Sequence, residues 1–193
     1  MRVRVNKKNG ANKGLAILLD STYLLPVFGV EVKEVSEEVL LKIRSLALRG
    51  LIETYYSPLS LIEIASKVAR ETIRRGRGLK PEEVEYTIRI IEESEYLKPI
   101  YPNPQAYALA YKMKLLGHKD MIDNLLYATA TVHKLTFITI DQKLKNFIQH
   151  HKIEGATILS HHELLQHYQP QPPSSTNHHI NTMKTRRRHE SSG

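Results

Sequence analysis

The chain of 193 residues contains no cysteine and no tryptophan. The lack of cysteine excludes disulfide scaffolds, zinc ribbons and thiol nucleophiles. Long apolar runs are missing as well, since the longest one near the N-terminus, residues 15–19, is ended by Asp20. Such a run is too short for a signal-peptide core or a membrane span. We therefore expect a cytoplasmic protein with no membrane partner.

Negative charge is absent from one end of the chain and rare at the other. Residues 1–13 carry five basic residues and no acid, and residues 169–193 carry four basic residues against one acid. The net charge of +8 therefore lies in the two ends, and 19 basic residues face 19 acidic ones between them. We predict a basic flexible tail (1–13), a folded domain (14–168) and a disordered Pro/Ser/His/Arg-rich tail (169–193). The tails either bind RNA phosphates or only keep the protein hydrated.

Within the predicted domain, strand-like segments alternate with amphipathic helical ones. Strands are expected at 15–19, 51–56, 96–101, 135–140 and 156–159, with helices at 36–49, 59–75, 81–94, 104–116, 120–133, 141–149 and 161–168. Right-handed crossovers place the helices on both faces of the sheet. The pattern predicts an α/β fold, a three-layer α/β/α sandwich around a mainly parallel sheet of four to five strands, with ligands bound at the carboxyl ends of the strands.

Aspartate is scarce, with four residues against 16 glutamates, and three of the four aspartates fall where this fold binds ligands. Asp20 and Asp141 end two predicted strands, and Asp123 lies in the first turn of the helix that leads into the second of these strands. If the strands are neighbours, the three carboxylates converge, and Glu63 points to the same edge. Clustered carboxylates need a compensating cation. Oxygen ligands favour Mg²⁺ or Mn²⁺, which suits phosphodiester hydrolysis.

Each of these acids also has a structural interpretation. Asp20 and Asp141 are suited to turns or helix N-caps, and Glu63 can pair with Lys67 one helical turn later. Either Asp120 or Asp123 can cap the helix that they open. For Asp120, which can also assist the site, we favour capping.

Four segments together resemble the PIN-domain nuclease family: ILLDSTYL (17–24), SLIEIA (60–65), DNLLYATA (123–130) and FITIDQKL (137–144). The resemblance covers about residues 15–165. It implies that Asp20, Glu63, Asp123 and Asp141 are the catalytic acids that hold Mg²⁺ or Mn²⁺, with support from Ser21 and Thr139. It also implies metal-dependent RNA cleavage and a homodimer. Many small members of the family are toxins of VapBC toxin–antitoxin pairs, which makes an antitoxin protein a possible partner here.

Basic residues near the predicted site have two interpretations. Lys67 and Arg70 follow Glu63 on one helical stripe, and a glycine-containing loop with its flanks carries Arg74, Arg75, Arg77 and Lys80. They either contact RNA phosphates or form a solvated, ion-paired surface. We read the histidines, eight of which lie from His150 onward, as surface residues. Tyr101, Tyr107 and Tyr111 favour core or dimer packing over stacking on bases.

The leading hypothesis is a Mg²⁺- or Mn²⁺-dependent endoribonuclease, for which the role of a VapBC-type toxin is open. The alternative is a catalytically silent RNA-binding or assembly module that keeps the fold and uses its basic tails. A phosphatase with an aspartyl nucleophile ranks last, because Thr22 stands where that chemistry usually has a second aspartate.

Overall fold

The fold is built on five parallel strands. In the computed structural model, residues 14–76 and 78–168 are described, so both predicted tails and Arg77 lie outside the described residues. The strands pair in the order β3-β2-β1-β4-β5. Their bounds are Leu15–Leu19 (β1), Ile52–Tyr56 (β2), Leu97–Pro99 (β3), Thr136–Ile138 (β4) and Ile158–Leu159 (β5). The predicted three-layer α/β/α arrangement is confirmed, and all five strands are parallel.

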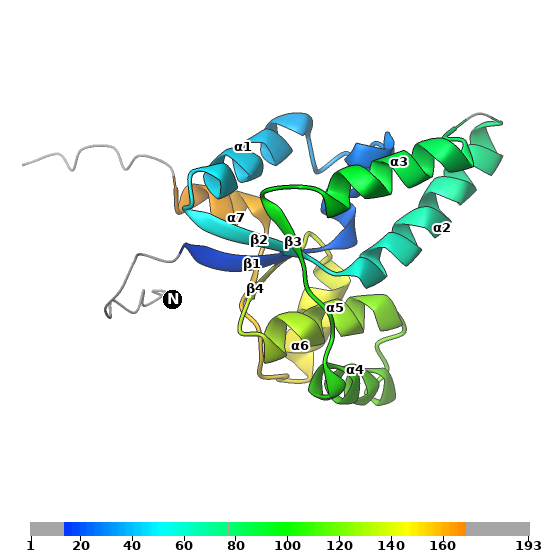
Figure 1. The fold of residues 1–193 in the computed structure, drawn as a ribbon. Coiled ribbons are helices and arrows are strands. Elements are labelled where there is room, and N and C mark those ends of the chain that lie inside the picture. The colour runs from blue at the N-terminus through cyan, green and yellow to red at the C-terminus, as the bar shows by residue number, and fades with distance from the viewer. Residues whose placement is uncertain (1–13, 77, 169–193) are drawn as a thin grey trace, which may run out of the picture.

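Helices cover both faces of the sheet (Figure 1). They are α1 (Glu37–Leu48), α2 (Pro58–Arg75), α3 (Pro81–Glu92), α4 (Pro104–Leu115), α5 (Met121–Val132), α6 (Gln142–His150) and α7 (His161–Gln166). Three of them begin with proline, whose fixed φ suits the first turn and whose missing N–H costs nothing there. Gly76 ends α2 with φ 64°, which is a left-handed conformation that glycine adopts without strain. None of these helices in the described part of the chain is long and apolar enough to cross a membrane.

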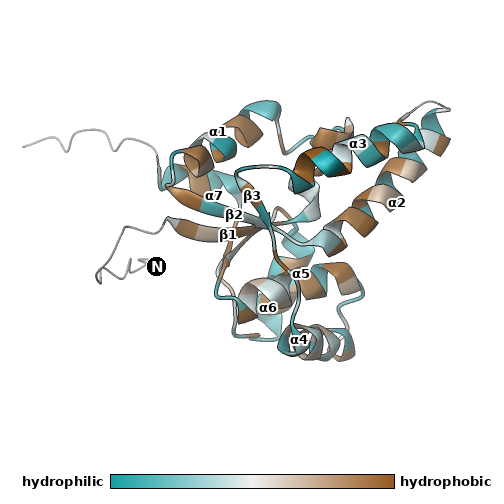
Figure 2. Cartoon of the chain, viewed as in Figure 1, coloured by the Kyte–Doolittle hydropathy of each residue, from teal (hydrophilic) through white to brown (hydrophobic). Residues whose placement is uncertain are grey.

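Alternate residues of β1 belong to two separate cores. Ile17 and Leu19 pack in a cluster with buried residues of α1, α2, α3 and α7, whereas Leu18 packs in a cluster with α4, α5 and α6. All three side chains are buried, because side chains of a strand alternate between the faces of a sheet and both faces here are covered by helices. Figure 2 shows the hydrophobic residues of β1 and the mixed hydropathy of the surrounding helices.

The structure adds local detail that the sequence pattern did not indicate. Two short 3-10 turns, η1 (Ser21–Tyr23) and η2 (Leu25–Phe28), follow β1 directly. Strand β4 is shorter than its predicted range, 135–140, mainly because the chain turns after Ile138 into the loop that precedes α6. Strand β5 ends at Leu159 as predicted, but it begins at Ile158, two residues later than the predicted range of 156–159.

One histidine contradicts the expectation that the histidines are surface residues. His161, the first residue of α7, is 1% exposed, and its Nδ1 lies 3.1 Å from the hydroxyl oxygen of Tyr23. The partner is 138 residues away in the sequence, which is why the local pattern of paired histidines gave no sign of burial.

Truncation of Leu126 tests the second core. This side chain on α5 is fully buried, so Leu126→Ala is expected to lower the free energy of unfolding by about 3 kcal/mol through lost burial and a cavity. Leu41→Ala, on a residue of α1 that is 54% exposed, is the matched control and is expected to change it by less than about 0.5 kcal/mol. Chemical denaturation measures both. Equal effects would contradict the assignment of Leu126 to a close-packed core.

Candidate functional site

Asp20 occupies the centre of the sheet edge where β1 and β4 end. Its backbone N–H donates to the carbonyl of Ile138 at 3.0 Å, which extends the pairing of the two strands by one residue. The carboxylate accepts hydrogen bonds from Thr139 Oγ1 at 2.6 Å and from Ser21 Oγ at 3.2 Å. With 4% of its surface exposed, Asp20 is a buried carboxylate held by hydroxyl groups on both sides.

The same threonine also fixes the chain at Asp141. The backbone N–H of Asp141 donates to Thr139 Oγ1 at 3.0 Å, so this hydroxyl accepts from one acidic residue and donates to another. Asp141 in turn caps α6, because its Oδ1 accepts from the backbone N–H groups of Lys143 at 2.7 Å and Leu144 at 3.1 Å. The side chain therefore has the capping role that aspartate favours, and Thr139 links the backbone of Asp141 to the carboxylate of Asp20.

Helix α5 brings two more carboxylates to the cluster. Asp120 caps the helix by accepting from the backbone N–H groups of Ile122 at 2.9 Å and Asp123 at 3.2 Å, as expected for this residue. Burial raises the pKa of Asp123 from 3.8 to about 8, and nearby negative charges add to the rise. In decreasing order of effect, these charges belong to Asp120, Asp20, Glu63 and Asp141.

Glu63 reaches the site from the second turn of α2. This helix is capped by the hydroxyl of Ser57, which accepts from the N–H of Leu59 at 3.3 Å. Glu63 Oε1 lies 2.5 Å from Lys67 Nζ, the ion pair that the four-residue spacing allows. Its Oε2 is buried and has no hydrogen-bond partner among the described residues. Burial raises the pKa of Asp20, the hydrogen bond from Thr139 opposes this rise, and the charge of Glu63 adds to it.

The carboxylates of Asp20, Glu63 and Asp141 thus act electrostatically on that of Asp123. They are not arranged as a complete set of metal ligands. Among residues 14–76 and 78–168, no three acidic, histidine or cysteine side chains stand close enough together to hold a metal ion. The donor chemistry nevertheless fits a hard divalent cation: every candidate ligand is a carboxylate, and Glu63 Oε2 is a buried acceptor without a donor. A cation at this edge would relieve the repulsion that raises the pKa of Asp123.

The basic residues predicted nearby are partly engaged in ion pairs. Arg74 and Arg75 contact Glu71 at 2.7 and 3.0 Å, and Arg70 is exposed on the same helix. Lys80 begins the capping box of α3, in which its backbone N–H donates to Glu83 at 2.7 Å. The ion-paired surface is therefore present at the end of α2. Contacts of these arginines with RNA stay a prediction.

A polar pair beside Asp123 was not singled out from the sequence. Asn124 is fully buried, its Oδ1 lies 2.7 Å from His118 Nδ1, and its Nδ2 donates to the carbonyl of His118 at 3.3 Å. These bonds tie the loop before α5 to the first turn of that helix, and so they fix the direction in which Asp123 leaves the backbone. The one available signal was an amide side chain next to the apolar run of α5.

An apolar groove lies apart from the acids, between α1 and α3. It encloses about 320 Å³ and is lined by the 3-10 turns and both helices, with Val27, Leu40, Ile43, Leu48, Ile90 and Ile91 among its residues. Val27, Leu48 and Ile90 are 44%, 57% and 47% exposed, which is unusual for aliphatic side chains that gather in one hollow.

A five-stranded parallel sheet with carboxylates gathered at the carboxyl ends of β1 and β4 defines an α/β protein with an acidic site at the sheet edge. The chain belongs to the PIN domain family, whose model matches residues 15–148. This range includes Asp20, Glu63, Asp123 and Asp141. The resemblance stated from the four sequence segments is therefore confirmed.

Solved structures are similar to this chain at low sequence identity. VapBC2 from Rickettsia felis, bound to a DNA fragment from their promoter, is 15% identical with a TM-score of 0.53, over 76% of this chain and 98% of that chain. FitAcB from Neisseria gonorrhoeae is 18% identical with a TM-score of 0.48, over 75% and 97% of the two chains. PAE2754 from Pyrobaculum aerophilum is 14% identical with a TM-score of 0.48, over 81% and 92%. No curated protein sequence matches the chain.

The raised pKa of Asp123 has a consequence for stability. Because the folded protein binds this proton more tightly than the unfolded chain does, ionisation of Asp123 destabilises the fold as the pH rises from about 4 to about 8. Without divalent ions, Asp123→Asn is expected to raise the free energy of unfolding by roughly 2 kcal/mol at pH 8, since partial exposure screens part of the shift, and by much less at pH 4.5.

Denaturation in EDTA at the two pH values measures this difference. Glu154→Gln, on an exposed glutamate of the loop after α6, is the control and should show no such pH dependence. A gain for Asp123→Asn that is the same at both pH values would contradict the repulsive cluster.

Proposed function

We propose that the chain is a metal-dependent endoribonuclease whose Asp20, Glu63, Asp123 and Asp141 bind Mg²⁺ or Mn²⁺. The observation that carries this proposal is the hydroxyl of Thr139, which holds Asp20 and the backbone of Asp141 together at one edge of the sheet. The charges of Asp20, Glu63 and Asp141 also add to the effect of burial in raising the pKa of Asp123. Membership of the PIN domain family supports nuclease chemistry at such a site. The alternative of a silent RNA-binding module gives no reason to bury Asp20 among other carboxylates.

The roles of the side chains follow from their contacts. Asp20 is the most strongly fixed ligand, because Thr139 and Ser21 hold its two oxygens in place. Asp141 and Asp120 cap their helices through Oδ1, which leaves Oδ2 of each carboxylate for a ligand or a bound water. When bound, the divalent ion would lower the pKa of a water molecule and stabilise negative charge on the phosphate.

RNA would reach the site across positively charged surface. Arg70, Arg74 and Arg75 lie on α2 beyond Glu63, and Arg77 follows them in the sequence, so these residues would contact phosphates of the bound strand at increasing distance from the acids. The basic residues of 1–13 and 169–193 add sequence-independent attraction for nucleic acid. We propose that the protein acts in this way in the cytoplasm.

Cleavage of a mixed single-stranded RNA tests the proposal. Purified protein is expected to cut the RNA with Mn²⁺ or Mg²⁺ and to stop in EDTA. Asp20→Asn and Asp123→Asn are each expected to lower the rate about 100-fold or more, because either change removes a charged ligand from the ion. Glu154→Gln, the exposed control, should cut at the rate of the unchanged protein.

RNA binding without cleavage, unaffected by Asp20→Asn and abolished by removal of both tails, would support the silent module and contradict the nuclease. Gel shift and cleavage on the same RNA distinguish the two. Cleavage that continues in EDTA would contradict only the requirement for a metal ion and not the nuclease activity.

A protein partner is also proposed, a helical antitoxin segment seated in the groove between α1 and α3. The groove is apolar and open, as helix-in-groove recognition requires, and the similar Rickettsia felis structure is a VapBC2 complex.

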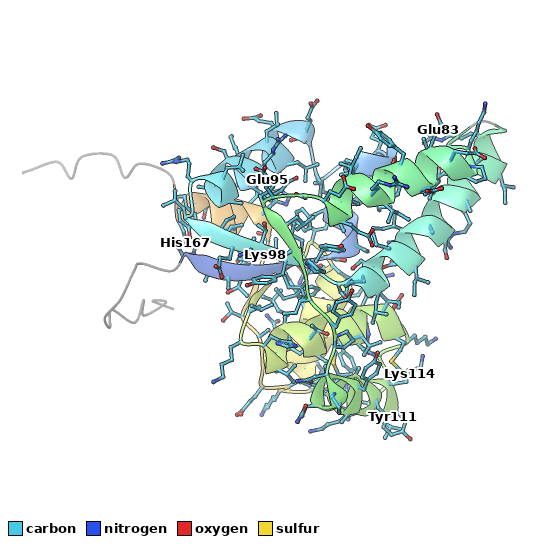
Figure 3. All side chains as sticks on the ribbon, viewed as in Figure 1. Glu83, Glu95, Lys98, Tyr111, Lys114 and His167 are labelled. Carbon is cyan, nitrogen blue, oxygen red and sulfur yellow. The ribbon has the colours of Figure 1, made fainter. Side chains whose placement is uncertain are left out.

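We further propose a homodimer, for which α4 offers Tyr107, Tyr111 and Leu115 on one exposed stripe. Figure 3 shows Tyr111 pointing away from the body of the protein, and its side chain is 60% exposed, so the core packing considered from the sequence does not hold for it.

Charge placed in the groove tests the antitoxin site. The partner tried is the polypeptide encoded beside this gene, added to the RNA cleavage assay. Leu48→Glu is expected to raise the concentration needed for half-inhibition about tenfold or more, since a carboxylate would have to be buried against apolar side chains. Leu41→Glu, on an exposed leucine of the same helix that does not line the groove, is the control. Equal inhibition of both variants would contradict this placement.

A further inference from the structure

One cation stands inside the acidic cluster of Asp20, Glu63, Asp123 and Asp141. The Nζ of Lys67 lies 2.5 Å from Glu63 Oε1, and the two side chains are only 30% and 17% exposed. The charge of Lys67 acts beyond this partner, since it opposes the rise in the pKa of Asp20. Lys67 therefore neutralises part of a site to which a divalent ion is proposed to bind.

Another lysine–glutamate pair of the same spacing serves for comparison. Lys42 and Glu38 on α1 are also four residues apart and lie 2.6 Å from each other, but their side chains are 55% and 75% exposed. Water screens that pair strongly, so it contributes little. The Glu63–Lys67 pair differs in its burial and in the further carboxylates that surround it.

The two carboxylate oxygens of Glu63 differ in their partners. Oε1 pairs with Lys67, and Oε2 is buried without a hydrogen-bond donor in the described residues. A divalent ion bound through Oε2 would bring two positive charges close to the ammonium group of Lys67. Repulsion between these like charges at short range is large in a partly buried site, and Lys67, on a flexible stem with 30% exposure, is free to move toward solvent.

We propose that Lys67 is an internal counter-cation of this site: it pairs with Glu63 in the metal-free protein and leaves Glu63 when a divalent ion binds. The inference rests on the metal site of the proposed function. Lys67 then pairs with Glu63 only while no divalent ion is bound. Its positive charge stabilises the metal-free site, and the same charge weakens the binding of a divalent ion. The displaced ammonium group is then available to a phosphate at the site.

Mn²⁺ binding without RNA tests the exchange. Free Mn²⁺ is measured by electron paramagnetic resonance for the unchanged full-length protein, Lys67→Met, Lys67→Gln and the control Lys42→Met. Lys67→Met and Lys67→Gln are each expected to lower the dissociation constant about tenfold or more, since each removes the competing charge. Lys42→Met should leave it unchanged. In EDTA, the two Lys67 variants are also expected to unfold at a lower temperature than the unchanged protein, and Mn²⁺ should remove this difference.

Displacement itself is followed by nuclear magnetic resonance with diamagnetic Mg²⁺. The Lys67 side-chain signals, identified by their loss in Lys67→Arg, are expected to move on saturation with Mg²⁺ to the positions of exposed lysines. Stationary Lys67 signals while Mg²⁺ binds, or an unchanged Mn²⁺ affinity in both neutral variants, would overturn the exchange.

These outcomes are separate from those of the proposed function. Metal-dependent RNA cleavage that Asp20→Asn abolishes, together with a Mn²⁺ affinity unaffected by Lys67→Met, would leave the nuclease standing and reject the role of Lys67. Mn²⁺ binding that Asp20→Asn abolishes and Lys67→Met strengthens, without any RNA cleavage, would support the exchange and reject the nuclease. Absence of Mn²⁺ binding in every variant would contradict both.

Discussion

The hydrogen bond from Thr139 Oγ1 to Asp20 Oδ2 joins the ends of the two central strands at the point where negative charge gathers. Thr139 also accepts the N–H of Asp141, so one hydroxyl orients two acidic residues that are 121 positions apart. The buried position of Asp20 is unfavourable for a charged group, and Asp123 and Glu63 increase the cost. Packing of hydrophobic residues on both faces of the sheet is what holds these carboxylates together without a cation.

Capping and ligand binding are compatible functions for the acids at this edge. Asp120 and Asp141 each use Oδ1 to accept two backbone N–H groups at the start of a helix. A carboxylate has a second oxygen, so the structural interpretation of these residues does not compete with the chemical one. The caps also orient the side chains, because the backbone hydrogen bonds restrict their rotation. Helix starts thus place acids at the carboxyl ends of the strands, where parallel sheets bind ligands.

The sequence sufficed for the sheet and for placing Asp20 at the end of a central strand, for reasons visible in particular residues. Residues 15–19 form an uninterrupted apolar run because both faces of β1 are covered, and Asp20 stands out directly after it. Contacts between residues that are far apart in the sequence could not be predicted from local sequence patterns. The burial of His161 depends on Tyr23, and the groove depends on α1 and α3 meeting the 3-10 turns, so neither was predicted. The Glu63–Lys67 pair was anticipated from its spacing, but its burial was not.

The central claim is that the aspartates at the ends of β1, β4 and the start of α5 share one electrostatic environment. Because the chain has only four aspartates, selective ¹³C labelling of the aspartate side-chain carboxyl carbons gives four signals that single Asp→Asn substitutions assign. The account predicts that, in EDTA, the carboxyl group of Asp123 titrates near its raised pKa of about 8. It also predicts that saturating Mg²⁺ shifts this titration downward. Titration of Asp123 near 3.8, with or without Mg²⁺, would contradict the account.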